Sequence, residues 1–284
     1  MQLKKVEKWI TMFLLLSSIF ISVVLVEATV LALTDQFKAI FIYLSLIPAF
    51  AIAMLFSTHL KKDVKFFPSI TIPCVLVFIL ISLLLIFYPH DSFGGADQSV
   101  YSNLASHLVN TSSIKLPSYL NNLTDNYVEK VQTWPKGYPI WLGIQQILFG
   151  TLWMLRSNII IIILGLSSFF FVSAYFVRNK LGLIATALFS SSMPFLWFSR
   201  EAMSENLSFF LLWSIILFLF LSLKTKNHIY LIPVFICSWL FGLTRYEGFL
   251  LQFVLLIVLF LLLLLNKVKF KMILMTMAIY ILVL

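Results

Sequence analysis

Three short polar stretches of this chain carry carboxylates, two of them beside an arginine, in a sequence that is otherwise mostly apolar. Their charged residues are Asp91, Asp97, Arg200, Glu201, Glu205, Arg245 and Glu247. A carboxylate next to a hydroxyl can take its proton while a new bond forms. An arginine presents a fork of N–H donors that matches the oxygens of a phosphate. These residues are therefore the candidates for a functional site, with Arg245 suited to an anionic headgroup such as phosphate.

The first stretch predicts an amphipathic helix that begins near Asp97. Apolar residues recur after it at three- and four-residue spacing, at Val100, Tyr101, Leu104, Ala105 and Leu108. One such stripe is typical of a helix lying on a membrane, and Asp97 would then sit near the lipid headgroups. Judged alone, Asp97 is also explained as a helix N-cap, and Asp91 as a solvated acid at the end of an apolar run.

The second stretch places Glu201 and Glu205 four residues apart, which on a helix gives them a common face. Arg200 stands beside them. Acids at the start of a helix also complement its dipole, so either Glu alone has a purely structural explanation. The sequence predicts that both acids and Arg200 contribute to substrate binding at the mouth of an apolar helix.

The third stretch, Arg245 to Gly248, is predicted to be a tight turn between two apolar helices. Arg245 would bind an anionic headgroup and Glu247 would line the same site. The alternative is that both are simply the charged residues of an exposed turn. A fourth segment, 133–139, combines Lys136 and Tyr138 with a Pro-Gly turn. Its aromatic residues would stack on a sugar or anchor at the membrane interface.

The composition excludes an ordinary soluble domain, because 61% of the 284 residues are hydrophobic and 11% are charged. Apolar runs long enough to cross a bilayer recur along the chain. They cover 9–33, 39–57, 69–88, 158–177, 181–199, 206–223, 229–243 and 248–266. A further run starts near Met272 and stops at Leu284, so we expect a truncated C-terminal element. The formal charge of +9 does not indicate nucleic acid, because the basic residues flank these runs as topogenic charges do.

The charge distribution predicts a cytoplasmic N-terminus and a segment, 138–155, that does not cross the membrane. In that topology the inner loops hold 13 Lys and Arg against 2 acids, and the outer loops hold 7 against 8. Positive charge collects on the cytoplasmic side of membrane proteins. A crossing at 138–155 would move seven of the inner basic residues outside. The long external region then covers about 89–157, and all three acidic stretches share its side.

The predicted fold is an all-α, polytopic membrane protein with a long external loop that carries interfacial helices. Residues 1–66 form two N-terminal transmembrane helices, and 67–284 form the main transmembrane module. Cys74 and Cys237 lie within apolar runs, and no His or Cys spacing indicates a metal site. No metal ligand is assigned, and a divalent cation is left open as a cofactor.

Over about 85–250 the chain resembles the GT-C superfamily of polytopic glycosyltransferases. It is most similar to the protein O-mannosyltransferase and lipid A aminoarabinose transferase type, and more distantly to oligosaccharyltransferase catalytic subunits. Four motifs in order carry the resemblance. They are Asp97, Tyr101 and Ala105; the segment from Trp134 to Gly150; Pro194, Arg200, Ser204 and Glu205; and Arg245, Glu247 and Gly248.

The resemblance implies transfer of a sugar from a polyprenyl-phosphate donor to a hydroxyl of a lipid, glycan or protein acceptor at the outer face. Asp97 takes the position of the general base, with Asp91 as the neighbouring alternative. Gln98 stands where many members have a second acid. Two alternatives stay open: a transporter or flippase of lipid-linked glycans, which would bury charges at mid-membrane, and a catalytically inactive assembly subunit.

Overall fold

The computed structural model describes residues 2–66, 68, 70, 72–87, 96–114, 135–154, 156, 158–201 and 203–264. These residues form helices and connecting turns, with no β-strand among them, so the all-α prediction is confirmed. The helices are α1 (Gln2–Leu33), α2 (Ala39–Asp63), η1 (Val64–Phe66), α3 (Ile72–Phe87), α4 (Ala96–Thr111), α6 (Gly137–Phe149), α7 (Thr151–Met154), α8 (Asn158–Ser190), α9 (Met193–Arg200), α10 (Ser204–Thr225), η3 (His228–Tyr230), α11 (Leu231–Thr244) and α12 (Glu247–Leu264).

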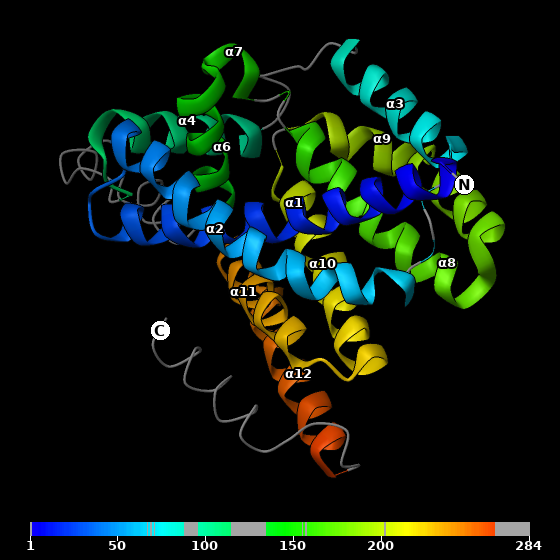
Figure 1. Cartoon of the computed structure of the whole chain (residues 1–284). Coiled ribbons are helices and arrows are strands. Elements are labelled where there is room, and N and C mark those ends of the chain that lie inside the picture. The colour runs from blue at the N-terminus through cyan, green and yellow to red at the C-terminus, as the bar shows by residue number, and fades with distance from the viewer. Residues whose placement is uncertain are drawn as a thin grey trace.

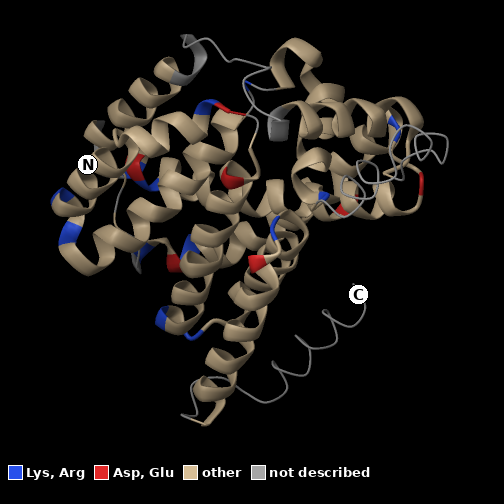
Figure 2. Ribbon diagram, turned by 180° about the vertical axis from the view of Figure 1, so that it is seen from behind, with Lys and Arg blue, Asp and Glu red and all other residues tan. Residues whose placement is uncertain are grey.

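Five stretches of helix are long and apolar enough to cross a membrane: Lys5–Leu33, Ala39–Asp63, Thr151–Ser190, Ser204–Thr225 and Glu247–Leu264. The runs predicted at 69–88 and 229–243 give the shorter helices α3 and α11, of 16 and 14 residues. Figure 2 shows long stretches of ribbon that carry neither acidic nor basic residues. The structure therefore agrees with the membrane protein that the sequence predicts. The residues beyond Leu264, including the run that starts near Met272, lie outside the described part.

The helices pack as a bundle around α10, which contacts α8 on one side and α11 on the other. Helices α1 and α2 form an antiparallel pair, and α1 also contacts α6, α8 and α11 (Figure 1). The side chain of Ser22 in α1 is 3.3 Å from the Sγ of Cys237 in α11. Helix α12 packs on α11 and leaves most of its apolar side chains exposed, as a helix facing lipid would.

Helix α8 is a hairpin of two helical arms that fold back on each other at Arg178. Arg178 has φ 71° and ψ 158°, outside the helical region. The two arms are in close contact, since a Cβ on Gly182 would lie only 2.6 Å from the Cα of Ala174. Phe169 also stacks on Phe189, with ring centroids 5.1 Å apart. The break at Arg178 falls between the runs predicted at 158–177 and 181–199, but the second run is not one continuous helix. A turn at Ser191 and Ser192 separates the second arm from α9, whose second residue is Pro194.

One end of the bundle gathers the connections that the sequence places in the cytoplasm, and we call it the lysine end. Its exposed basic residues are Lys61, Lys62, Lys65, Arg178, Lys180, Lys224 and Lys226. Asp63 at the end of α2 accepts hydrogen bonds from the Tyr230 hydroxyl at 2.8 Å and from Asn227 Nδ2 at 3.3 Å. Lys224 Nζ donates to the Tyr175 hydroxyl at 2.7 Å. These contacts place the 59–65 and 224–230 connections at the same end.

The opposite end, which we call the cavity end, gathers the connections predicted to be external. The backbone N–H of Phe37 donates to the carbonyl of Ser112 at 3.2 Å, which joins the α1–α2 turn to the end of α4. Helix α6 has 13 residues, or about 20 Å at 1.5 Å per residue, against a hydrocarbon core of about 30 Å. Whether the segment 138–155 crosses the membrane stays a prediction. Which face of the membrane each end occupies stays a prediction.

Cysteine labelling at the two ends tests this topology. We expect Lys226→Cys to react with a membrane-impermeant maleimide only after the membrane is opened, and Tyr246→Cys to react in sealed cells. Both native positions are exposed, and the native Cys74 and Cys237 are buried, which keeps the background low. Labelling of Lys226→Cys in sealed cells would show that the lysine end faces outward and would contradict the topology.

Candidate functional site

A cavity of about 300 Å³ opens at the cavity end of the bundle. Its walls come from α4, from Pro135 two residues before α6, from the start of α10, and from the end of α11 with the turn into α12. The lining residues are Tyr101, Pro135, Ser204, Glu205, Thr244, Arg245, Tyr246 and Glu247. Its size falls at the lower limit of ligand pockets. Four residues singled out in the sequence, Tyr101, Glu205, Arg245 and Glu247, therefore meet here although they are spread over almost 150 positions.

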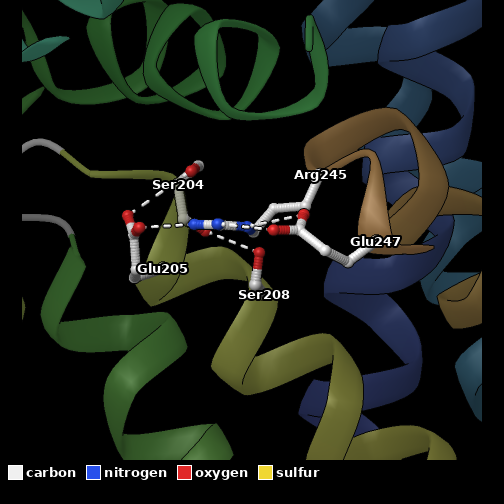
Figure 3. Close-up of polar contacts among 5 residues, drawn as sticks. All are labelled: Ser204, Glu205, Ser208, Arg245 and Glu247. Carbon is white, nitrogen blue, oxygen red and sulfur yellow. Dashed lines mark hydrogen bonds and ion pairs between the residues drawn. The ribbon is translucent and has the colours of Figure 1, made fainter. Parts of the chain in front are cut away.

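Arg245 lies between two carboxylates and contacts both (Figure 3). Its Nε and Nη2 donate to Glu247 Oε2 and Oε1 at 3.2 and 3.0 Å, which makes a two-pronged pair. Its Nη1 donates to Glu205 Oε1, and Ser204 Oγ donates to the other Glu205 oxygen at 3.4 Å. The Glu247 hydrogen bonds, followed by the charge of Glu205, raise the pKa of Arg245. The arginine is therefore permanently charged and held in one orientation.

Two glycines let the chain approach closely enough to build this corner. A Cβ on Gly248 would lie 2.5 Å from the backbone of Phe241 and Gly242, so only glycine allows α12 to fold back on α11 here. A Cβ on Gly137 would lie 2.6 Å from Thr244 Oγ1. The start of α6 thus packs directly on the end of α11, which brings Pro135 to the cavity.

Helix α4 forms as the sequence predicts, but its apolar stripe packs on protein instead of lipid. The stripe residues are buried and α4 contacts α6. Tyr101 meets Tyr138 edge to face, with ring centroids 5.3 Å apart. Asp97 belongs to the first turn of α4, one turn before Tyr101, whereas its side chain and all of Asp91 lie outside the described part of the structure. The proposed approach of Asp97 to Glu205 and Arg245 stays a prediction.

Behind the cavity, a buried hydrogen-bond network joins α6, α8 and α10. Asn158 Nδ2 donates to the Tyr138 hydroxyl at 2.9 Å and to the carbonyl of Glu201 at 3.2 Å. Asn206 Nδ2 donates to the same carbonyl at 2.8 Å. All of these residues are buried, and burial raises the pKa of the Tyr138 hydroxyl. The network fixes the turn that leads into Glu205, and it also backs the ring of Tyr101.

Several residues expected to bind substrate do not line the cavity. Helix α9 ends at Arg200 and α10 begins at Ser204, so Glu201 lies in the turn between them. The prediction that Glu201 and Glu205 share one helix face is wrong for this reason. Glu201 is buried and its backbone carbonyl anchors the network instead. Arg200, Lys136 and Tyr138 also lie outside the cavity lining, although Lys136 follows the lining residue Pro135.

The cavity includes residues that sequence reasoning did not assign to it, namely Pro135, Thr244 and Tyr246. Asn158 and Asn206 were missed as well. A usable signal existed for the two asparagines, because each lies in the first turn of an otherwise apolar helix, where a buried amide needs partners. The described residues contain no group of three or more His, Cys, Asp or Glu that could hold a metal ion.

Comparison of the chain with protein-family models, with curated proteins and with solved structures gives no match.

Removing the Asn158 amide should destabilise the fold. We expect Asn158→Leu to lower the free energy of unfolding by about 1–3 kcal/mol, because it takes a hydrogen-bond partner from two buried groups. The double variant with Tyr138→Phe should lose less than the sum of the two single losses, since each change removes the other's partner. Thermal unfolding in detergent would measure this, with Asn103→Leu on the exposed side of α4 as control. Additive losses would contradict the network.

Lys136 should titrate at an unusually low pH for a lysine. Burial lowers its pKa to about 8. We expect acylation of Lys136 by an amine-reactive ester to reach half its maximum rate near that pH, because only the neutral amine reacts. Added Nα-acetyl-lysine, with an ordinary pKa of about 10.4, should do so about two pH units higher. Mass spectrometry across a pH series would measure both, and equal profiles would show that Lys136 is not desolvated.

Proposed function

We propose that this chain is a membrane glycosyltransferase that moves a sugar from a polyprenyl-phosphate donor to a hydroxyl of a lipid, glycan or protein acceptor. The observation that supports this best is the convergence of Tyr101, Glu205, Arg245 and Glu247 on one cavity at an end of an apolar bundle. Carboxylates accept hydrogen bonds from sugar hydroxyls, aromatic rings cover a sugar face, and arginine binds phosphate. The resemblance to GT-C glycosyltransferases agrees with that combination.

The location of the cavity suits a lipid-linked donor. A polyprenyl chain stays within the bilayer, so its phosphate and sugar are reached only at the membrane boundary. The cavity lies where α10 and α12 begin, and both are helices long enough to cross a membrane. A donor could therefore keep its tail among the apolar helices while its head enters the cavity from the side.

Transport of a lipid-linked glycan is less well supported by the described charges. A flippase would place ionisable groups at mid-membrane along a path. In the described part of the chain, Glu27 is the acid that lies well inside a long apolar helix, and the others lie near helix ends or in turns. A path across the bundle would need more polar groups than these.

In the proposed reaction Asp97 takes the proton of the acceptor hydroxyl while the sugar is transferred. The position of Asp97, one turn before Tyr101 on α4, is compatible with this role because Tyr101 lines the cavity. Arg245 would stabilise the phosphate that leaves, since a cation aimed at developing negative charge lowers the barrier. Glu205 and Tyr246 would contact the sugar.

Replacing Asp97 by asparagine tests whether Asp97 acts as a general base or only as a helix cap. Asn has a similar size and still caps a helix, but it cannot accept a proton at neutral pH. We therefore expect Asp97→Asn to lose transfer activity by about 10²-fold or more while membrane insertion and thermal stability are unchanged. Transfer from radiolabelled polyprenyl-phosphate sugars, measured with the full chain in membranes, would show this.

Control variants distinguish a wrongly assigned base from a wrongly assigned enzyme class. Glu7→Gln makes the same carboxyl-to-amide change near the lysine end and should keep full activity. Loss of activity in Asp91→Asn with an active Asp97→Asn would move the base by six residues and leave the enzyme class intact. Full activity of both variants would count against a glycosyltransferase that uses a base in this region.

A further inference from the structure

All three nitrogens of the Arg245 guanidinium are already occupied by carboxylates of the chain itself. Glu247 takes Nε and Nη2 through its two oxygens, and Glu205 takes Nη1 (Figure 3). The Nε–Nη2 edge is one of the two edges with which a guanidinium can bind two phosphate oxygens at once. An incoming anion therefore finds the cation of the cavity paired, with one more negative than positive charge among the lining residues.

The two carboxylates differ in how easily they can leave. The Glu247 side chain is 65% exposed and stands two residues from Arg245 in the same turn, whereas Glu205 is 38% exposed. Glu205 belongs to α10 and also accepts a hydrogen bond from Ser204. Rotation of the Glu247 side chain into water moves no helix and leaves its charge solvated. Release of Glu205 would break two contacts and leave its carboxylate in the cavity wall.

We propose that Glu247 is an internal ligand of Arg245 that a phosphate displaces on binding. The phosphate takes the Nε–Nη2 edge, Glu247 turns into solvent, and Glu205 keeps Nη1 and holds the guanidinium in place. This deepens the proposed function, on which it depends only for the identity of the phosphate as part of a sugar donor. The ion pair of Glu247 thus sets the affinity of the cavity, since each anion must compete with it.

The exchange predicts that weakening the internal ligand tightens phosphate binding. The affinity for a phosphate should rise about two- to five-fold in Glu247→Gln, which is the range expected from releasing an exposed ion pair. Glu247→Asp keeps the charge but shortens the side chain by one methylene, so it no longer reaches both nitrogens. It should also tighten binding. Arg245→Gln should abolish binding at this site.

Titrations of the full chain in phosphatidylcholine nanodiscs test these expectations in two arms. One arm adds inorganic phosphate, followed by ³¹P NMR line broadening, and the other incorporates a polyprenyl monophosphate. Glu7→Gln is the charge-matched control near the lysine end and should leave both affinities unchanged. Tightening in the first arm shows a site open to free phosphate, and tightening confined to the second shows one reached from the bilayer. Either result supports the displacement.

Three results would overturn it. Unchanged or weaker binding in Glu247→Gln in both arms would show that Glu247 does not compete. Tighter binding in Glu247→Gln but not in Glu247→Asp would assign the effect to overall charge. Persistence of binding in Arg245→Gln would place the phosphate elsewhere. Because these titrations measure binding alone, they stay informative if no sugar is transferred, and a failed transfer assay would leave the displacement standing.

Discussion

The fold depends on how an apolar helical bundle accommodates polar groups. Inside such a bundle an amide or carbonyl is stable only if another polar group meets it. At the cavity end this condition is met around the carbonyl of Glu201, which accepts from both Asn158 and Asn206. The break between α9 and α10 exposes that carbonyl, and its two partners fix the break in place. The position of Glu205, and through it that of Arg245, follows from this arrangement.

The sequence predicted those features that depend on the local spacing of apolar residues and on the requirements of the bilayer. The apolar stripe that buries Tyr101 follows from helical spacing, and the meeting of Glu205 with Arg245 follows from a charge count that puts both at one end. The fate of Glu201 could not be predicted, because it depends on a turn before α10 that is held by an asparagine 43 residues away. The same holds for the turn at Ser191 and Ser192, which divides the run predicted at 181–199. The break at Arg178, in contrast, falls between the runs predicted at 158–177 and 181–199.

The two ends of the bundle solve the same problem with different chemistry. At the lysine end, Asp63 accepts hydrogen bonds from the neutral donors Tyr230 and Asn227, and the surrounding lysines are exposed. At the cavity end, carboxylates are satisfied by a cation, and their charge is drawn into one corner. The hydrogen bonds from neutral donors hold two connections together. A cation shared by two carboxylates forms a site in which the ion pairs can change without unfolding the bundle.

That difference bears on how the cavity can bind an anion. A lone arginine in this corner would attract any anion from the solvent and would depend on water to stabilise it. With two carboxylates in contact, Arg245 keeps both its charge and its orientation before a ligand arrives, so little ordering remains to be done on binding. The cost is competition from Glu247, which is modest because that pair is exposed. The phosphate of a sugar donor is a diester with one negative charge, as on Glu247, and the phosphate that leaves carries up to two. Both offer the same two-oxygen edge. Either can therefore take over that edge while Glu205 holds the guanidinium in register with the cavity.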